Sequence, residues 1–152
     1  MNSTTEAQKT GAAKIPILPI IAAIVALGGL VDAIYLTVHH LTGVNVQCSV
    51  VTGCETVLSS EYATIAGVPL AVFGAVAYFT VFSLAVFAAF GNNRAWQLLS
   101  VAVVLMAIFT VWLLYLQAFV IQAFCQFCLI SAATTFALLA IVAVRQFWFR
   151  SR

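Results

Sequence analysis

Long apolar runs dominate the chain and are separated by few polar positions. The first two runs cover residues 17–38, interrupted only by Asp32, and residues 68–90. A third stretch, residues 95–144, contains no Asp, Glu, Lys or Arg. Because a helix needs about 20 apolar residues to cross the hydrocarbon core of a membrane, each of the first two runs is long enough for one crossing.

The third stretch is too long to cross once. Its 50 residues would form a helix about 75 Å long at the standard rise of an α-helix. Gln117 and Gln122 interrupt the apolar run, so we place a turn within residues 117–124 and predict helices over residues 95–116 and 125–144. The pattern therefore predicts an all-α integral membrane protein, a bundle of four transmembrane helices.

Composition supports this fold class. Hydrophobic residues make up 64% of the 152 residues and charged residues only 7%, whereas about a quarter of the residues in soluble domains are charged. The polar residues 1–14 predict a disordered cytoplasmic tail before a membrane domain at residues 15–146. In residues 147–152, Trp148 lies among arginines, which predicts a cytoplasmic interfacial tail.

The basic residues all fall on one side of the predicted bundle. Two precede the first helix, one lies between the second and third, and three follow the fourth: Lys9, Lys14, Arg94, Arg145, Arg150 and Arg152. The positive-inside rule makes that side of the cell membrane cytoplasmic. Both termini are then cytoplasmic, while the loop at residues 39–66 and the turn before the last helix face outside, where disulfides persist.

Cys125 and Cys128 form a CxxC pair at the outer end of the last predicted helix. Two thiols at this spacing can close a small disulfide, and a helix start favours a thiolate, so the pair indicates redox chemistry. The apolar surroundings limit the electron acceptor to a lipid-soluble molecule. The chain has four cysteines, which permit three complete pairings, and sequence does not choose among them.

The outer loop carries the second cysteine pair. Cys48 and Cys54 enclose five residues, and Thr52 with Glu55 fits a capping box that would start a short amphipathic helix. The face of this helix that points toward the bundle would contain Cys54, Val57, Leu58, Ile65 and, as a further candidate, Tyr62. We hypothesise a relay in which Cys48 meets an outside partner and Cys54 attacks Cys125.

Other interpretations of the polar residues stay open. The four cysteines could hold a structural zinc ion, although only one pair has the usual spacing, or could form two purely structural disulfides. Asp32 could handle protons, face water at the outer boundary, or bond a neighbouring helix. The adjacent His39 and His40 diverge by about 100° on a helix, which excludes joint ligation of one haem iron. No nucleic-acid-binding pattern appears.

Taken together, the motifs resemble the vitamin K epoxide reductase family, most closely its bacterial members. The resemblance covers residues 17–144. Beside Cys48, it rests on Asp32-Ala-Ile-Tyr-Leu36, Cys54-Glu-Thr-Val-Leu-Ser-Ser-Glu-Tyr-Ala63, Gly67-Val-Pro-Leu-Ala-Val-Phe-Gly74 with Tyr78, and Cys125-Gln-Phe-Cys128. This combined spacing is much more specific than a lone CxxC.

The resemblance implies that the bundle holds a quinone, either ubiquinone or menaquinone, near its outer surface and needs no metal. Cys125 and Cys128 would be the catalytic pair, and Cys48 and Cys54 the shuttle. Electrons would pass from a substrate dithiol to the shuttle, then to Cys125, and finally from Cys128 to the quinone. By position, the quinone-binding residues would be Val57, Leu58, Phe73, Tyr78, Leu113 and Phe127.

Two departures from the family pattern bear on function. Vertebrate members follow the CxxC with Thr-Tyr-Ala, whereas this chain has Ile130-Ser131-Ala132, which argues against epoxide reduction. Many bacterial members carry a fused thioredoxin-like domain, whereas this chain stops at Arg152, so a separate exported thioredoxin-fold oxidase is the expected partner. We expect a membrane thiol:quinone oxidoreductase that makes disulfide bonds. The alternatives are a vitamin K epoxide or quinone reductase and a non-catalytic tetraspan subunit with structural disulfides.

Overall fold

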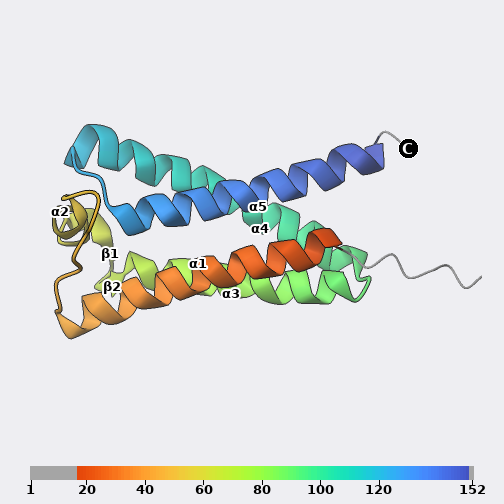
Figure 1. The fold of residues 1–152 in the computed structure, drawn as a ribbon, viewed down its shortest axis with the longest axis horizontal. Helices are drawn as coiled ribbons and strands as arrows, with labels where there is room; N and C mark the ends of the chain where they lie inside the picture. Colours follow the sequence, from red (N-terminus) through yellow and green to blue (C-terminus); the bar gives the residue numbers. More distant parts are fainter. Residues whose placement is uncertain (1–16, 151–152) are drawn as a thin grey trace, which may run out of the picture.

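Four long helices account for most of residues 17–150, the part of the chain that this computed structural model describes (Figure 1). They are α1 (Ile17–Thr42), α3 (Leu70–Ala89), α4 (Asn93–Tyr115) and α5 (Gln126–Arg150). A π-helix, η2 (Leu116–Ile121), extends α4 without a break. All four are long and apolar enough to cross a membrane, so the predicted four-span, all-α fold is confirmed.

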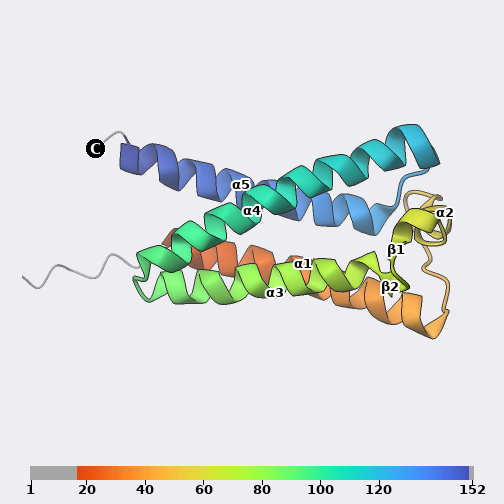
Figure 2. The ribbon, with the colours of Figure 1, turned by 180° about the vertical axis from the view of Figure 1, so that it is seen from behind.

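Each long helix packs against two neighbours: α1 and α4 both contact α3 and α5. Figures 1 and 2 show α1 and α3 running antiparallel along each other, with α5 lying across α4. The core contains small residues of α1, chiefly Ala22, Ala26 and Ala33, together with Val81 and Ala85 of α3. Small residues let helix backbones approach closely, and close packing holds helices together where lipid surrounds them.

The Tyr78 side chain ties three helices together in the middle of the bundle. Its ring lies so close to Gly29 of α1 that a Cβ atom at Gly29 would collide with it. Its hydroxyl lies 2.8 Å from the Ser131 carbonyl oxygen and 2.9 Å from Thr135 Oγ1, both on α5. Tyr78 is therefore fully buried, and its polar end is satisfied by the opposite helix.

The outer loop covers the end of the bundle where α4 turns into α5 (Figures 1 and 2). It contains a short helix, α2 (Cys54–Leu58), and a 3-10 helix, η1 (Glu61–Ala63). A two-stranded antiparallel hairpin of β1 (Thr64–Ile65) and β2 (Val68–Pro69) leads into α3. The start of α1, the α3–α4 turn and the end of α5 lie at the opposite end of the bundle (Figure 1).

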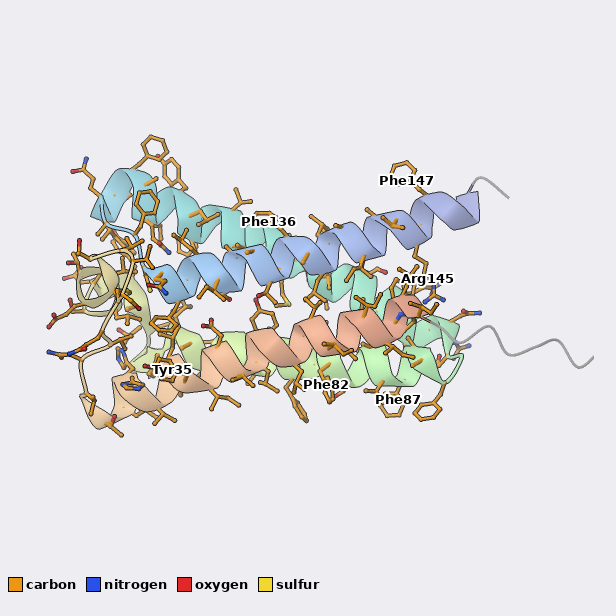
Figure 3. The ribbon with its side chains drawn as sticks, in the orientation of Figure 1. Tyr35, Phe82, Phe87, Phe136, Arg145 and Phe147 are labelled. Atoms are coloured by element: carbon orange, nitrogen blue, oxygen red, sulfur yellow. A yellow bond between two sulfur atoms is a disulfide. The ribbon has the colours of Figure 1, made fainter. Side chains whose placement is uncertain are left out.

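Two of the arginines used to predict orientation lie at this opposite end. Arg94 is in the first turn of α4, and the Arg145 guanidinium lies 4.0 Å from the centre of the Trp96 ring. Figure 3 shows Arg145 far along the bundle from Tyr35, which lies at the end covered by the outer loop. Lys9, Lys14 and Arg152 are outside the described residues, so the orientation itself stays a prediction.

Several predicted boundaries differ from the structure. The α1 helix runs to Thr42 and so includes His39 and His40, and α5 continues through residues 147–150. The predicted tail at residues 1–14 lies outside the described residues. Both extensions contain polar or basic side chains, His39 and His40 in α1 and Arg145 in α5, and such side chains are tolerated in the last turns of a membrane helix, where they can reach water.

The predicted capping box at the start of α2 was wrong. The N-cap is Gly53, one residue after Thr52, and no side chain caps the helix. The helix is only five residues long, so Tyr62 and Ile65 lie beyond it, in η1 and β1, and both are exposed. A short amphipathic helix is nonetheless present, with Cys54 and Val57 on its buried face.

Candidate active site

Cys125 occupies the N-cap position of α5, the residue just before the helix begins. Its carbonyl oxygen accepts the first hydrogen bond of the helix, from the Leu129 N–H at 3.0 Å. Its sulfur accepts a second, from the Cys128 N–H at 3.4 Å. The Cys125 sulfur therefore stands where a serine or aspartate oxygen usually caps a helix.

This position makes Cys125 an activated thiol. A hydrogen bond from the Cys128 thiol, assisted by the backbone N–H groups of Cys128 and Phe127, lowers the pKa of Cys125 from 9.0 to about 7, although burial acts in the opposite direction. The thiolate fraction of Cys125 at neutral pH is therefore higher than that of an ordinary cysteine. Since the thiolate is the form that attacks disulfides, Cys125 suits thiol–disulfide exchange.

The loop disulfide lies directly against this thiol. Cys48 and Cys54 are bonded to each other, with their Cα atoms 6.0 Å apart, while Cys125 and Cys128 are free thiols. Cys54 is 1% exposed and Cys125 is 0% exposed, and the two belong to one buried cluster with Val57. Cys48 packs at the edge of this cluster and is partly exposed. The structure thus brings all four predicted cysteines to one end of the bundle.

Two contacts hold the loop on the CxxC segment. The Gln126 Oε1 atom accepts a hydrogen bond from the Val50 N–H at 3.1 Å. The backbone of Gly53 lies so close to Phe124 that a Cβ atom at Gly53 would be 2.6 Å from the Phe124 carbonyl oxygen and 2.8 Å from its nitrogen. Only glycine allows the chain just before Cys54 to approach the chain just before Cys125 this closely.

A largely apolar cavity of about 370 Å³ lies between the four helices under the outer loop. A volume of this order suits a small ring-shaped ligand. Of the predicted quinone-binding residues, five line the cavity: Val57, Leu58, Phe73, Tyr78 and Leu113. Phe127 lies outside the lining and packs on the cysteine cluster, with its ring 5.1 Å from that of Tyr35. Quinone binding by these residues stays a prediction.

The two cysteines of the CxxC pair differ in their relation to the cavity. Cys128 lines the cavity, whereas Cys125 does not and instead packs against Cys54. Asp32 also lines the cavity, and its Oδ2 atom is buried without a hydrogen-bond partner among the described residues. Because a buried acceptor without a partner is costly, the Asp32 carboxyl group is suited to meet a ligand or a proton.

Gly53, Gln117 and Gln126 contribute to this site but were not predicted as site residues. Gln117 is 4% exposed, and its Oε1 atom accepts a hydrogen bond from the Cys125 N–H at 3.2 Å. In the sequence, Gln117 served only to mark a break in an apolar run. A polar side chain within a membrane helix is itself a signal of an interior partner, and that signal could have identified Gln117.

Known proteins with similar sequences include a thiol-disulfide oxidoreductase, which agrees with the cluster of four cysteines. The sequence profile of the "Vitamin K epoxide reductase family" matches residues 20–143. The chain is also similar to "Thiol-disulfide oxidoreductase LTO1" of Arabidopsis thaliana, with 32% identity over 118 residues, which cover 72% of this chain and 31% of the relative. The chain thus spans about a third of that relative's length. With the family profile matching most of its length, the chain belongs to the vitamin K epoxide reductase family.

Proposed function

We propose that this protein is a membrane thiol:quinone oxidoreductase that makes disulfide bonds in an exported thioredoxin-fold partner. One observation carries the proposal: a loop disulfide is packed on Cys125, while Cys128, one helical turn further on, lines an apolar cavity. This arrangement offers a thiol–disulfide step at Cys125 and access to a lipid-soluble acceptor at Cys128.

The cysteine steps balance as two-electron exchanges. A partner thiolate attacks Cys48 and releases Cys54; the second partner thiol then resolves this mixed disulfide, which leaves the partner oxidised and the loop pair reduced. Cys54 next attacks the Cys125–Cys128 disulfide at Cys125 and releases Cys128. Cys48 finally attacks Cys54, which restores the loop disulfide and releases Cys125. The product of this step is the state of the structure, with a bonded loop pair and two free CxxC thiols.

The cavity residues support quinone, ubiquinone or menaquinone, as the acceptor. Bound quinone takes up two electrons from the CxxC thiols and two protons, and leaves as the quinol. Cys128 would face it from α5, and Asp32 would face it from α1 and supply or relay a proton. The unpartnered Asp32 Oδ2 atom fits this role, because the cavity otherwise offers it no hydrogen-bond partner among the described residues.

The charge pattern supports a location in the cell membrane with both termini in the cytoplasm. Arg94 and Arg145 lie at the end of the bundle away from the cysteines, so the positive-inside rule would turn all four cysteines to the outer face. A thiol partner in the exported space would meet Cys48 first, since Cys48 is the partly exposed member of the loop pair.

The test is oxidation of a reduced thioredoxin-fold protein by the purified chain in lipid nanodiscs, with added quinone. We expect quinone-dependent oxidation that is lost in Cys125→Ser and in Cys128→Ser, while Gly28→Ala, a change into open space, retains it. Oxidation that continues without quinone, or that survives either cysteine change, would refute the mechanism. Turnover of a vitamin K epoxide in the same assay would favour the epoxide reductase alternative.

A further inference from the structure

Gln117 connects the end of α4 to the start of α5 through both its main chain and its side chain. Its carbonyl oxygen accepts hydrogen bonds from the Gln122 N–H and, at 3.2 Å, from the Ala123 N–H, which closes the wide π-helical turn. Its side-chain Oε1 atom accepts the Cys125 N–H, also at 3.2 Å. One residue therefore holds both ends of the turn that leads into the CxxC.

The Cys125 N–H needs an acceptor from outside its own helix. Cys125 is the N-cap residue and is 0% exposed, so its amide has neither a helical partner nor water. In a capping box, a Glu or Gln side chain at the third helical position accepts this N–H. Here that position is Cys128, which has no such side-chain acceptor and whose own N–H donates a hydrogen bond to the Cys125 sulfur. Gln117 supplies the missing acceptor from the preceding helix.

We infer that Gln117 is a positioning residue that completes the cap of α5 from α4 and thereby holds the Cys125 sulfur in its reactive place. The inference rests on the proposed function only in taking Cys125 as the thiol that exchanges with Cys54, a step in which a stabilised Cys125 thiolate is the better leaving group. Gln117 is suited to this role because it is buried and belongs to a π-helix, a distortion that is frequent at functional sites.

The expected effect of losing this acceptor is on the Cys125 thiolate. The groups that favour the thiolate, the Cys128 thiol and the N–H groups of Cys128 and Phe127, belong to the first turn of α5. If Cys125 is no longer fixed relative to that turn, its pKa returns from about 7 toward its ordinary value of 9.0. The thiolate fraction at neutral pH then falls by as much as about 50-fold.

The decisive variant is Gln117→Leu, and Gln117→Glu tests the effect of a charge at the same acceptor. Leucine has a similar volume and no acceptor, whereas glutamate keeps an acceptor for the Cys125 N–H and preserves the fold, but its negative charge disfavours a nearby thiolate. The matched control is Gln97→Leu, the same chemical change at an exposed position of α4 near the other end of the bundle. Both Gln117 variants should raise the pKa of Cys125, and the control should leave it unchanged.

The measurement is ultraviolet thiolate absorbance against pH, for the full-length protein in nanodiscs with Cys125 and Cys128 reduced. Subtracting the same protein with Cys125→Ser isolates the Cys125 titration. The expected midpoint is about pH 7 for the parent and is higher by one unit or more, about 10-fold in proton affinity, in both Gln117 variants. An unchanged midpoint in Gln117→Leu overturns the inference, as does a loss of thermal stability in that variant without a shift in midpoint.

This titration needs neither quinone nor a thiol partner. A parent protein that fails to oxidise its partner would refute the proposed function and leave the titration interpretable. A parent that is active, together with variants whose midpoints match it, would refute the role of Gln117 alone.

Discussion

Replacing Gly53 by alanine should separate the loop disulfide from the CxxC pair. Gly53 has φ −97° and ψ 5°, which alanine adopts without strain, so the effect is purely steric. The new Cβ atom would lie 2.6 Å from the Phe124 carbonyl oxygen, and a carbon–oxygen contact of about 3.3 Å requires the two backbones to part by about 0.7 Å. Since a misplacement of about 1 Å can cost about 100-fold in rate, we expect exchange between Cys54 and Cys125 to slow by about 10- to 100-fold.

The assay compares two half-reactions of the same protein. In the proposed mechanism, oxidation of a reduced thioredoxin-fold partner requires exchange between Cys54 and Cys125, whereas reduction of quinone by protein whose CxxC is already reduced does not. Gly53→Ala should slow the first and leave the second unchanged, and Gly28→Ala, with nothing within 4 Å of its new Cβ, should change neither. Equal rates in both half-reactions for Gly53→Ala and its parent would refute the steric argument. So would an equal loss in both half-reactions, because it would indicate general damage to the bundle.

Three further predictions follow from the buried groups. Gly29→Ala should lower stability by about 1–3 kcal/mol, because its Cβ collides with the Tyr78 ring; thermal unfolding measures this, and a melting temperature equal to that of the parent would contradict it. In the reverse exchange, in which reduced Cys125 attacks the loop disulfide, Cys125 must lose its proton, so the rate should rise as pH rises through about 7 and level off above; stopped-flow kinetics should detect this rise, and a flat profile would oppose it. Asp32→Asn should slow quinone reduction by about 100-fold without altering the Cys54 exchange; unchanged quinone turnover would exclude its role with protons.

The hydrophobic pattern was sufficient to predict the four spans, because membrane thickness fixes their length. It was less informative about where α4 ends. Gln117 and Gln122 look alike in the sequence as breaks in an apolar run, yet the helix continues past Gln117 to Ile121. Gln117 stays inside because the turn itself provides partners for its carbonyl and amide oxygens. Hydropathy cannot register such partners, since they come from residues that only the folded turn brings close.

In the candidate site, the cysteines could be predicted from the sequence, whereas the contacts that position them could not. The spacing of the cysteines and the resemblance to a family identified all four thiols, and the structure brings them together. The capping box failed because it considered only local hydrogen bonds. Gly53 is the N-cap of α2 instead, and it lies against the backbone of Phe124, about 70 positions away along the chain. The bond between Gln126 and Val50 is equally non-local. Contacts of this kind depend on how the outer loop is laid on the bundle, and no periodicity in the sequence encodes that placement.

The burial of Cys54 and Cys125 also bears on what the protein must avoid. A redox chain that joins two compartments of different potential loses its driving force if stray reductants reach its middle. Here both sulfurs at the internal junction are at most 1% exposed, and Cys48 alone of these three has partial contact with solvent. Of these three cysteines, small thiols in the surrounding solution can therefore reach only Cys48. In the proposed relay, the outer loop would both carry the exchanging Cys48–Cys54 pair and shield Cys125 from solvent.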